Sequence, residues 1–199
     1  AGHKLYGPKG IGALYIRSGI MPVKLMHGAD HEGNRRAGTE NVMEIAGLGK
    51  ACEIAKRDLG KNSLQFKATR DLLYDKINSA VKYVVRNGDP VNCLPNTLNL
   101  AFPGIDAGLL LSSMPGIAAS AGAACHSDKH SISHVLQAMG ISTDNAIGAV
   151  RFSTVKFTKT EEIEQSADII IRTVLDISSS LGKKPDRKMA SRIRLTEFT

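Results

Sequence analysis

A lysine next to a glycine-rich loop is the first feature of this sequence that suggests chemistry. Lys4 follows His3 and comes just before residues 7–12, which contain three glycines. A lysine that attacks a carbonyl group must lose its proton, and desolvation or nearby positive charge favours that loss. A histidine and close-approaching glycines beside it suit a ligand that carries a phosphate. Taken alone, the pattern is more typical of a surface lysine in a loop.

The second feature is a cysteine in a segment of small residues. Cys125 follows the alanine- and glycine-rich run 118–124 and precedes His126. This context predicts an accessible loop, in which a thiolate beside a histidine can act as a nucleophile. Cys52 and Cys93 are interpreted as packing residues, because free cysteine is among the most buried residue types. Three cysteines that lie far apart argue against a disulfide framework and against a zinc site built from cysteine pairs.

Arg151 stands at the start of a strand-like segment, directly after an apolar run. A planar guanidinium can bind a carboxylate through two parallel hydrogen bonds, although a surface ion pair is the ordinary role of such an arginine. His126, His130 and His134 recur every four residues. The expected change from loop to helix near residues 131–133 argues against their forming a metal site, so no metal is predicted.

Composition and charge narrow the class of protein. Of the 199 residues, 42% are hydrophobic and 23% are charged, the balance of an ordinary globular protein. No run approaches the roughly 18 apolar residues of a transmembrane helix, so a cytoplasmic or other reducing intracellular location is expected. Much of the net charge of +7 comes from a basic tail. We expect this tail to be a solvated end and nucleic-acid binding to be unlikely, with binding of another polyanion left open.

Hydrophobic periodicity and turn residues predict intermixed helices and strands, as in an α/β or α+β fold. Residues 18–39 are expected to form a long connecting loop. A glycine near residue 60 is expected to separate two helices. The expected strands are 11–16, 82–86, 97–102, 117–120 and 149–154, and the expected helices are 40–60, 62–81, 106–114, 133–139 and 160–181.

Six blocks of sequence resemble one family. They are HKLYGPKGIGALYIR (3–17), RRAGTEN (35–41), LPNTLN (94–99), SAGAACHSD (120–128), SHVLQAMGIS (133–142) and VRFSTVKFTKTEEIE (150–164). In this order they are similar to the C-terminal portion of cysteine desulfurases and selenocysteine lyases. These belong to the class-V aminotransferase group of pyridoxal-phosphate (PLP) enzymes of fold type I. The resemblance implies an α/β fold with an α+β small domain.

The resemblance also implies a domain division and roles for six residues. Residues 1–40 would end the large PLP-binding domain, 41–181 would form the small domain, and 182–199 the basic tail. Lys4 and Cys125 would be catalytic, the first as the cofactor lysine and the second as the sulfur-handling cysteine. The implied cofactor-binding residues are His3, Lys4 and Thr39, and the implied substrate-binding residues are Arg151 and Arg36.

The implied activity is PLP-dependent cleavage of the C–S bond of L-cysteine or the C–Se bond of L-selenocysteine. It would leave alanine, with sulfur held as a persulfide or with selenide released. A homodimer and a protein that accepts the sulfur or selenium are implied as well. The family's N-terminal half carries further cofactor contacts that these 199 residues lack. The alternative hypothesis is therefore a catalytically incomplete C-terminal fragment, or an interaction module related to such an enzyme.

Overall fold

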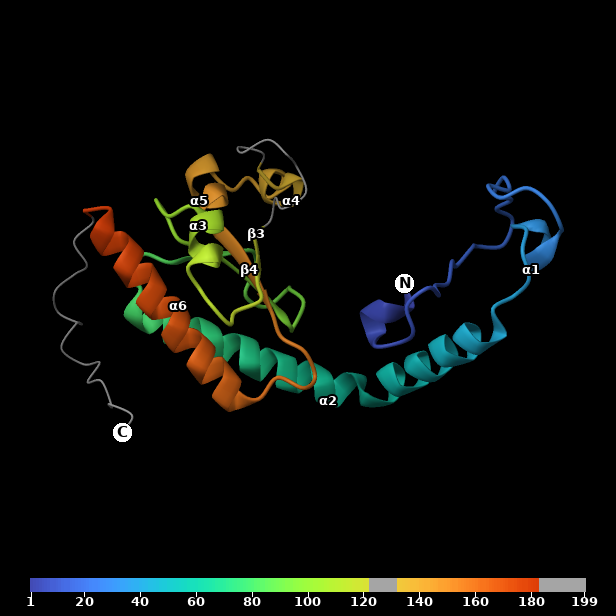
Figure 1. Cartoon of the computed structure of the whole chain (residues 1–199), viewed down its shortest axis with the longest axis horizontal. Helices are drawn as coiled ribbons and strands as arrows, with labels where there is room; N and C mark the ends of the chain where they lie inside the picture. Colours follow the sequence, from blue (N-terminus) through green and yellow to red (C-terminus); the bar gives the residue numbers. More distant parts are fainter. Residues whose placement is uncertain (122–131, 183–199) are drawn as a thin grey trace. The chain divides into compact units, whose positions relative to one another are not determined.

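The computed structural model describes residues 1–121 and 132–182, and its labelled elements are drawn in Figure 1. The chain divides into two compact units, residues 1–61 and 62–199. The division lies inside a helix, whereas the sequence placed a domain boundary at residues 40 and 41. The three-part division stays a prediction. Within the described ranges, no helix is long and apolar enough to cross a membrane.

Unit 1 consists mainly of loops around the start of a long helix. It contains the 3-10 helix η1 (Gly2–Leu5) and the four-residue turn α1 (His31–Asn34), and the rest of residues 18–39 is largely loop, as predicted. The strand predicted at 11–16 is wrong, since these residues form no strand. Leu14 and Tyr15 are 80% and 87% exposed. A strand needs a paired neighbouring strand, and within the described part of the chain residues 11–16 pair with no other strand.

Helix α2 (Val42–Ala80) is continuous over 39 residues and contributes to both units. Its first turn is capped by Asn41, whose side-chain oxygen accepts a hydrogen bond from the Glu44 N–H at 3.4 Å. The prediction of two helices separated near Gly60 is wrong. A glycine inside a helix costs only about 1 kcal/mol relative to alanine, which the helix formers on either side of Gly60 outweigh.

Unit 2 is built on a four-stranded antiparallel sheet with the strand order β1-β2-β4-β3. The strands are β1 (Val85–Asn87), β2 (Thr97–Ala101), β3 (Ser120–Ala121) and β4 (Ala149–Ser153). The strands predicted near β2 and β4 match to within one residue. Those predicted near β1 and β3 overlap the observed strands but begin about three residues too early.

The described part of unit 2 contains four further helices, and three of them were predicted. Asp106 caps α3 (Ala107–Ser112) by accepting a hydrogen bond from the Leu109 N–H at 2.9 Å. Glu162 accepts one from the Lys159 N–H at 2.8 Å where α6 (Thr160–Ser180) begins. The third is α4 (His134–Ala138). Helix α5 (Thr143–Ile147) was not predicted, because five residues are too few to show a helical period.

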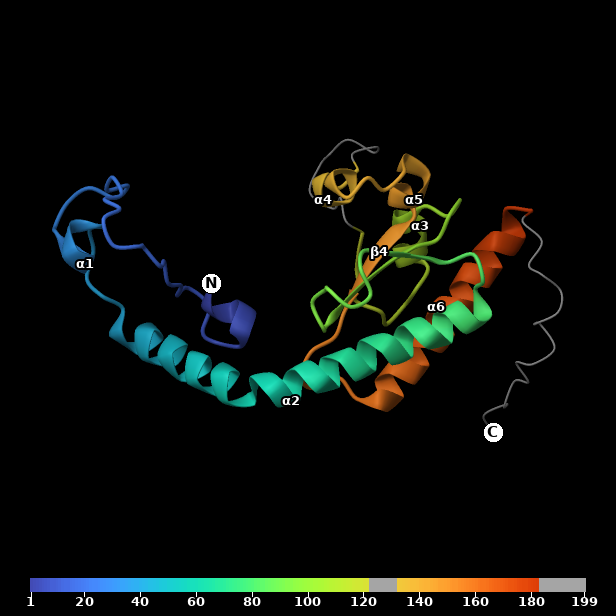
Figure 2. The same cartoon turned by 180° about the vertical axis from the view of Figure 1, so that it is seen from behind.

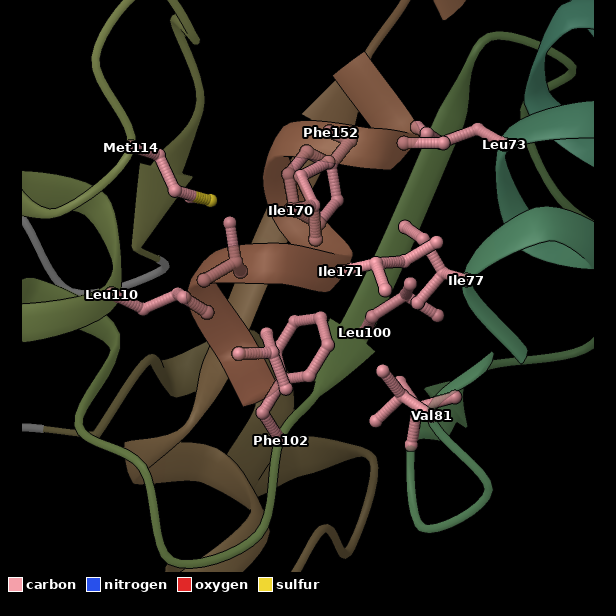
Figure 3. Packing of buried hydrophobic residues seen from close by; sticks show 14 of the residues in the cluster. Leu73, Ile77, Val81, Leu100, Phe102, Leu110, Met114, Phe152, Ile170 and Ile171 are labelled. Carbon is pink, nitrogen blue, oxygen red and sulfur yellow. The ribbon is translucent and has the colours of Figure 1, made fainter. Parts of the chain in front are cut away.

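One face of the sheet carries the main hydrophobic core. Side chains of β2 and β4 pack there against α6 and the second part of α2, which lie side by side in both views (Figures 1 and 2). Figure 3 shows Ile171 of α6 close to Ile77 of α2 and Leu100 of β2, and Ile170 of α6 close to Phe152 of β4. On the opposite face, Leu136 of α4 covers two small residues, Ala101 and Ala149. The mixed fold with a small antiparallel sheet confirms the predicted class.

Candidate functional site

The loop that carries Lys4 is closed by backbone hydrogen bonds. The Gly2 N–H donates to the Ile11 carbonyl at 2.8 Å, and the Gly7 N–H donates to the Gly2 carbonyl at 2.9 Å. Tyr6 completes the turn with a φ of 64°, in the left-handed region. These bonds fold residues 1–11 back on themselves and leave the side chains of His3 and Lys4 exposed on η1.

The first part of α2 supports this lysine loop. A Cβ atom added to Gly47 would lie 2.7 Å from Cγ of Pro8, and one added to Gly7 would lie 3.3 Å from Cβ of Ala51. Contacts this short leave no room for a larger side chain at residue 47 without displacing the proline ring. The glycine in α2 therefore lets helix and loop approach closely, and the helix positions the loop that holds Lys4.

Arg36 organises the loop that leads to Thr39. Its guanidinium donates hydrogen bonds to the carbonyl oxygens of Ala37, at 3.3 Å, and of Gly38, and it pairs with the Glu32 carboxylate at 3.3 Å. The side chain of Thr39 is exposed just beyond these contacts. Because the guanidinium is engaged within its own loop, the structure gives Arg36 an observed local role. Its predicted contact with substrate stays a prediction, as does the phosphate contact of Thr39.

Arg151 lies in a row of polar residues that crosses the whole sheet of unit 2. It stands opposite Asn99 of β2 and Ser120 of β3, and Asn99 in turn stands opposite Asn87 of β1. Directly opposed residues of antiparallel strands share a face, with their Cβ atoms about 4.5–5.5 Å apart. We call these four residues, Asn87, Asn99, Arg151 and Ser120, the polar row. Among the described residues, the exposed guanidinium of Arg151 has no hydrogen bond or ion pair.

Cys125 lies outside the described residues, as do His126 and His130. In the chain it stands between β3 and α4, and β3 pairs with β4. Ser120, five positions before Cys125, is therefore a cross-strand neighbour of Arg151. Of the predicted site residues that the structure describes, Arg151 lies on β4 of unit 2, whereas Lys4, His3, Arg36 and Thr39 belong to unit 1.

The interpretation of Cys52 and Cys93 as packing residues is wrong, because both are exposed. Sγ of Cys93 accepts a hydrogen bond from Nη1 of Arg70 at 2.9 Å, and Nη2 of Arg86 lies 3.9 Å from it. The hydrogen bond at 2.7 Å from the Asn87 side-chain amide to that of Asn99 was not predicted either. No local signal marks either contact, since each depends on the register or packing of distant segments.

Other kinds of site find little support in the described part of the chain. Residues 1–121 and 132–182 hold no group of three His, Cys, Asp or Glu side chains that could bind a metal ion. A surface pocket of about 460 Å³ lies beside Asp106 and Asp144 and includes none of the predicted site residues. The chemistry suggested by the sequence therefore remains with the lysine loop, the segment of Cys125 and the polar row.

Comparison with known proteins decides the family. Residues 1–165 match the family model described as aminotransferase class-V. The chain belongs to this family. Among class-V relatives, a cysteine desulfurase of Sinorhizobium fredii is 43% identical over 180 residues, which are 89% of this chain and 46% of the relative. The cysteine desulfurase NifS of Azotobacter vinelandii is 44% identical over 182 residues, 90% of this chain and 44% of the relative.

Two solved structures agree with the fold. A NifS-like protein matches with a TM-score of 0.76 and 32% identity, covering 86% of this chain and 44% of that one. SspA, solved in complex with cysteine, matches with a TM-score of 0.57 and 32% identity, covering 80% and 44%. This class-V chain spans less than half the length of these relatives. The family that the six sequence blocks indicated is confirmed.

Proposed function

We propose that this chain carries the cofactor lysine and the sulfur-accepting cysteine of a PLP-dependent cysteine desulfurase. The observation that supports this most is the exposed His3–Lys4 pair, held in a hydrogen-bonded loop against α2, in a chain whose curated relatives are named cysteine desulfurases. The substrate would be L-cysteine and the carbon product alanine. The activity would belong to an assembly that includes the residues found only in the longer relatives.

The residues of unit 1 fit the cofactor by their chemistry. PLP carries an aldehyde and a phosphate, and when bound it supplies an electron sink for the bond that is broken. The exposed amine of Lys4 suits the aldehyde, while the imidazole of His3 and the hydroxyl of Thr39 are hydrogen-bond donors of the kind that a phosphate accepts. Lys4 would also carry the proton that is removed from one substrate carbon and delivered to another.

Arg151 and Cys125 would act on the substrate itself. The unpaired guanidinium of Arg151 would bind the substrate carboxylate and so orient the amino acid. The thiolate of Cys125 would attack the substrate sulfur, so that an S–S bond forms as the C–S bond breaks and Cys125 is left as a persulfide. A thiol in this role must be reduced, which supports a reducing compartment. Arg36 is proposed as a further substrate-binding residue.

Three finer proposals go with this function. The block at residues 120–128 resembles selenocysteine lyases as well as desulfurases, so L-selenocysteine is the second candidate substrate. A homodimer would allow Thr39 to reach the phosphate of the partner subunit. A separate protein would accept the sulfur from Cys125. Parallel assays of sulfide and selenide release from the two amino acids, with alanine measured in both, would identify the substrate.

The test of the function begins with cofactor binding. PLP is added to the chain, and the visible absorbance of a lysine-bound cofactor is followed, with borohydride reduction and mass spectrometry to locate the modified lysine. We expect a modification at Lys4 that Lys4→Ala abolishes. Lys9→Ala, which replaces an exposed lysine of the same loop, is the matched control and should retain it.

Activity is then measured as alanine and sulfide released from L-cysteine, for this chain and for its longer parent. Cys125→Ser should abolish release, whereas Cys52→Ser should retain it. A parent protein that is modified at Lys4 but releases no alanine would contradict the proposed activity. A chain that binds no PLP while its parent does would support the incomplete-fragment alternative for these 199 residues.

A further inference from the structure

The side-chain amide of Asn99 is held in a fixed orientation within the polar row. Asn87 donates a hydrogen bond from Nδ2 to Oδ1 of Asn99 at 2.7 Å. Since the Asn99 oxygen is used in this way, its NH₂ group is the end left for another partner. Among the described residues, no oxygen accepts from that NH₂ group. Asn99 therefore presents donors without an acceptor.

These donors lie next to a second group of donors without an acceptor. Asn99 of β2 stands directly opposite Arg151 of β4, and their side chains share one face of the sheet. The Arg151 guanidinium is also unpaired within the described ranges. An amide NH₂ group and a guanidinium side by side can both be satisfied by one anion with two oxygen atoms, and a carboxylate has this form.

Asn87 destabilises the fold at the position that it occupies. Only 8% of it is exposed, and its Oδ1 atom is buried with no hydrogen-bond partner. A buried polar atom without a partner destabilises a fold, and a leucine of similar shape would avoid that cost. What Asn87 does achieve is to hold the amide of Asn99. This combination of a stability cost and a positioning contact is typical of residues that serve a binding site.

We infer that Asn99 is a second carboxylate-binding residue beside Arg151, and that Asn87 is the positioning residue that aims its amide. The substrate carboxylate accepts hydrogen bonds from the guanidinium on one side and from the Asn99 NH₂ group on the other. The inference rests on the proposed function only in assigning the carboxylate to an amino-acid substrate. Recognition by two donors from neighbouring strands would favour amino acids over amines that lack a carboxylate.

The test uses nuclear magnetic resonance of the isotope-labelled full chain, titrated with L-alanine. L-alaninamide, which lacks the carboxylate, is the control ligand. We expect the side-chain N–H signals of Arg151 and Asn99 to shift with L-alanine and to stay in place with L-alaninamide. Asn99→Leu should weaken binding about tenfold, the usual effect of losing one hydrogen bond to a charged group. Asn99→Ser, with a smaller side chain, repeats the test if the leucine variant does not fold.

The positioning role of Asn87 has its own readout. Asn87→Leu should weaken L-alanine binding while leaving the thermal unfolding temperature equal to or above that of the wild type. A purely structural residue would show the opposite pattern. Thr97→Val is the matched control, because Thr97 lies on the same face of the neighbouring strand β2, opposite Ser153, and outside the polar row.

The outcomes separate this inference from the proposed function. Binding of L-alanine that is unchanged in both Asn99 variants, or wild-type signals that respond equally to L-alanine and L-alaninamide, would overturn the inference. Sulfide release from L-cysteine is a separate measurement. Carboxylate binding that depends on Asn99, in a parent protein that releases no sulfide, would support the inference and contradict the function. Sulfide release by Asn99→Leu with an unchanged KM for L-cysteine would support the proposed function and contradict the inference.

Discussion

The Cys93 thiol is hydrogen-bonded to Arg70 and is not packed in the core. Nη1 of Arg70 donates to its Sγ at 2.9 Å, and the same guanidinium pairs with Asp71 at 2.8 Å although Arg70 is only 3% exposed. Free cysteine usually behaves as a small apolar residue, which is why the sequence favoured a core position. The contact with Arg70 joins residues 23 positions apart, and no local pattern indicates it.

The exposure of both cysteines leads to a prediction at the residue scale. In a Cys125→Ser chain, we expect Cys52 and Cys93 to react with a water-soluble disulfide reagent in the native protein, because both thiols are accessible. The released chromophore should correspond to two thiols without denaturant and to one in the Cys52→Ser or Cys93→Ser background. A thiol that reacts only after unfolding would contradict its exposed position in the fold.

At the scale of elements, the close contact between the lysine loop and α2 can be tested with two glycines of the same helix. Gly49→Ala meets no atom within 4 Å, so it should raise the free energy of unfolding by about 1 kcal/mol through helix propensity. Gly47→Ala would place its Cβ 2.7 Å from Pro8, so it should lose that gain and weaken PLP binding. Calorimetry and the PLP titration check both. Equal PLP binding by the two variants would show that the contact between α2 and the lysine loop does not position Lys4.

The turn after β1 gives a pH-dependent prediction. The Asp89 carboxylate accepts hydrogen bonds from the N–H groups of Asn92 and Val91, both at 2.7 Å, and these bonds lower its pKa below the usual 3.8. A lowered pKa in the folded state stabilises the protein above the unfolded-state value, and this stabilisation is lost as the pH falls through the folded-state value.

Asp89→Asn should therefore lower the thermal unfolding temperature at pH 7, and the difference from wild type should shrink as the pH falls below 3.8. Asp75→Asn is the control, since it removes a carboxylate that is exposed on α2. Unfolding followed by circular dichroism between pH 7 and pH 3 would measure both. A difference that grows as the pH falls would contradict this role of the turn.

The sequence predicted those elements whose signals are local. Asp106 marked the start of α3, and the apolar stripe of α6 was long enough to define its period. The strand at 11–16 and the break at Gly60 failed, because a strand depends on a partner and one glycine is a weak signal within a 39-residue helix. In the site, the residue types and family blocks indicated Lys4 and Arg151. The hydrogen bond between Asn87 and Asn99 depends on the register of β1 against β2. The residue pattern of a single strand does not predict that register.

At the scale of the whole molecule, the two units differ in how they use apolar side chains. Unit 2 buries a contiguous cluster around Leu100, Phe102 and Ile170, whereas residues 14–43 of unit 1 leave many large apolar side chains in water. Met21, Val23 and Leu25 are each at least 90% exposed. Exposed apolar surface in such amounts promotes association and binds hydrophobic dyes.

We therefore expect the chain alone to bind a hydrophobic fluorescent dye and to associate as its concentration rises, mainly through unit 1. Replacing Met21, Val23 and Leu25 by serine should reduce dye fluorescence and association, measured by light scattering, without lowering the unfolding temperature of unit 2. Replacing Val91 and Leu94, which are exposed in unit 2, should have a smaller effect because they stand apart from that segment in the sequence. Dye binding that is unchanged in the triple variant would mean that unit 2 supplies the apolar surface. It would contradict the prediction that the dye binds the exposed side chains of residues 14–43.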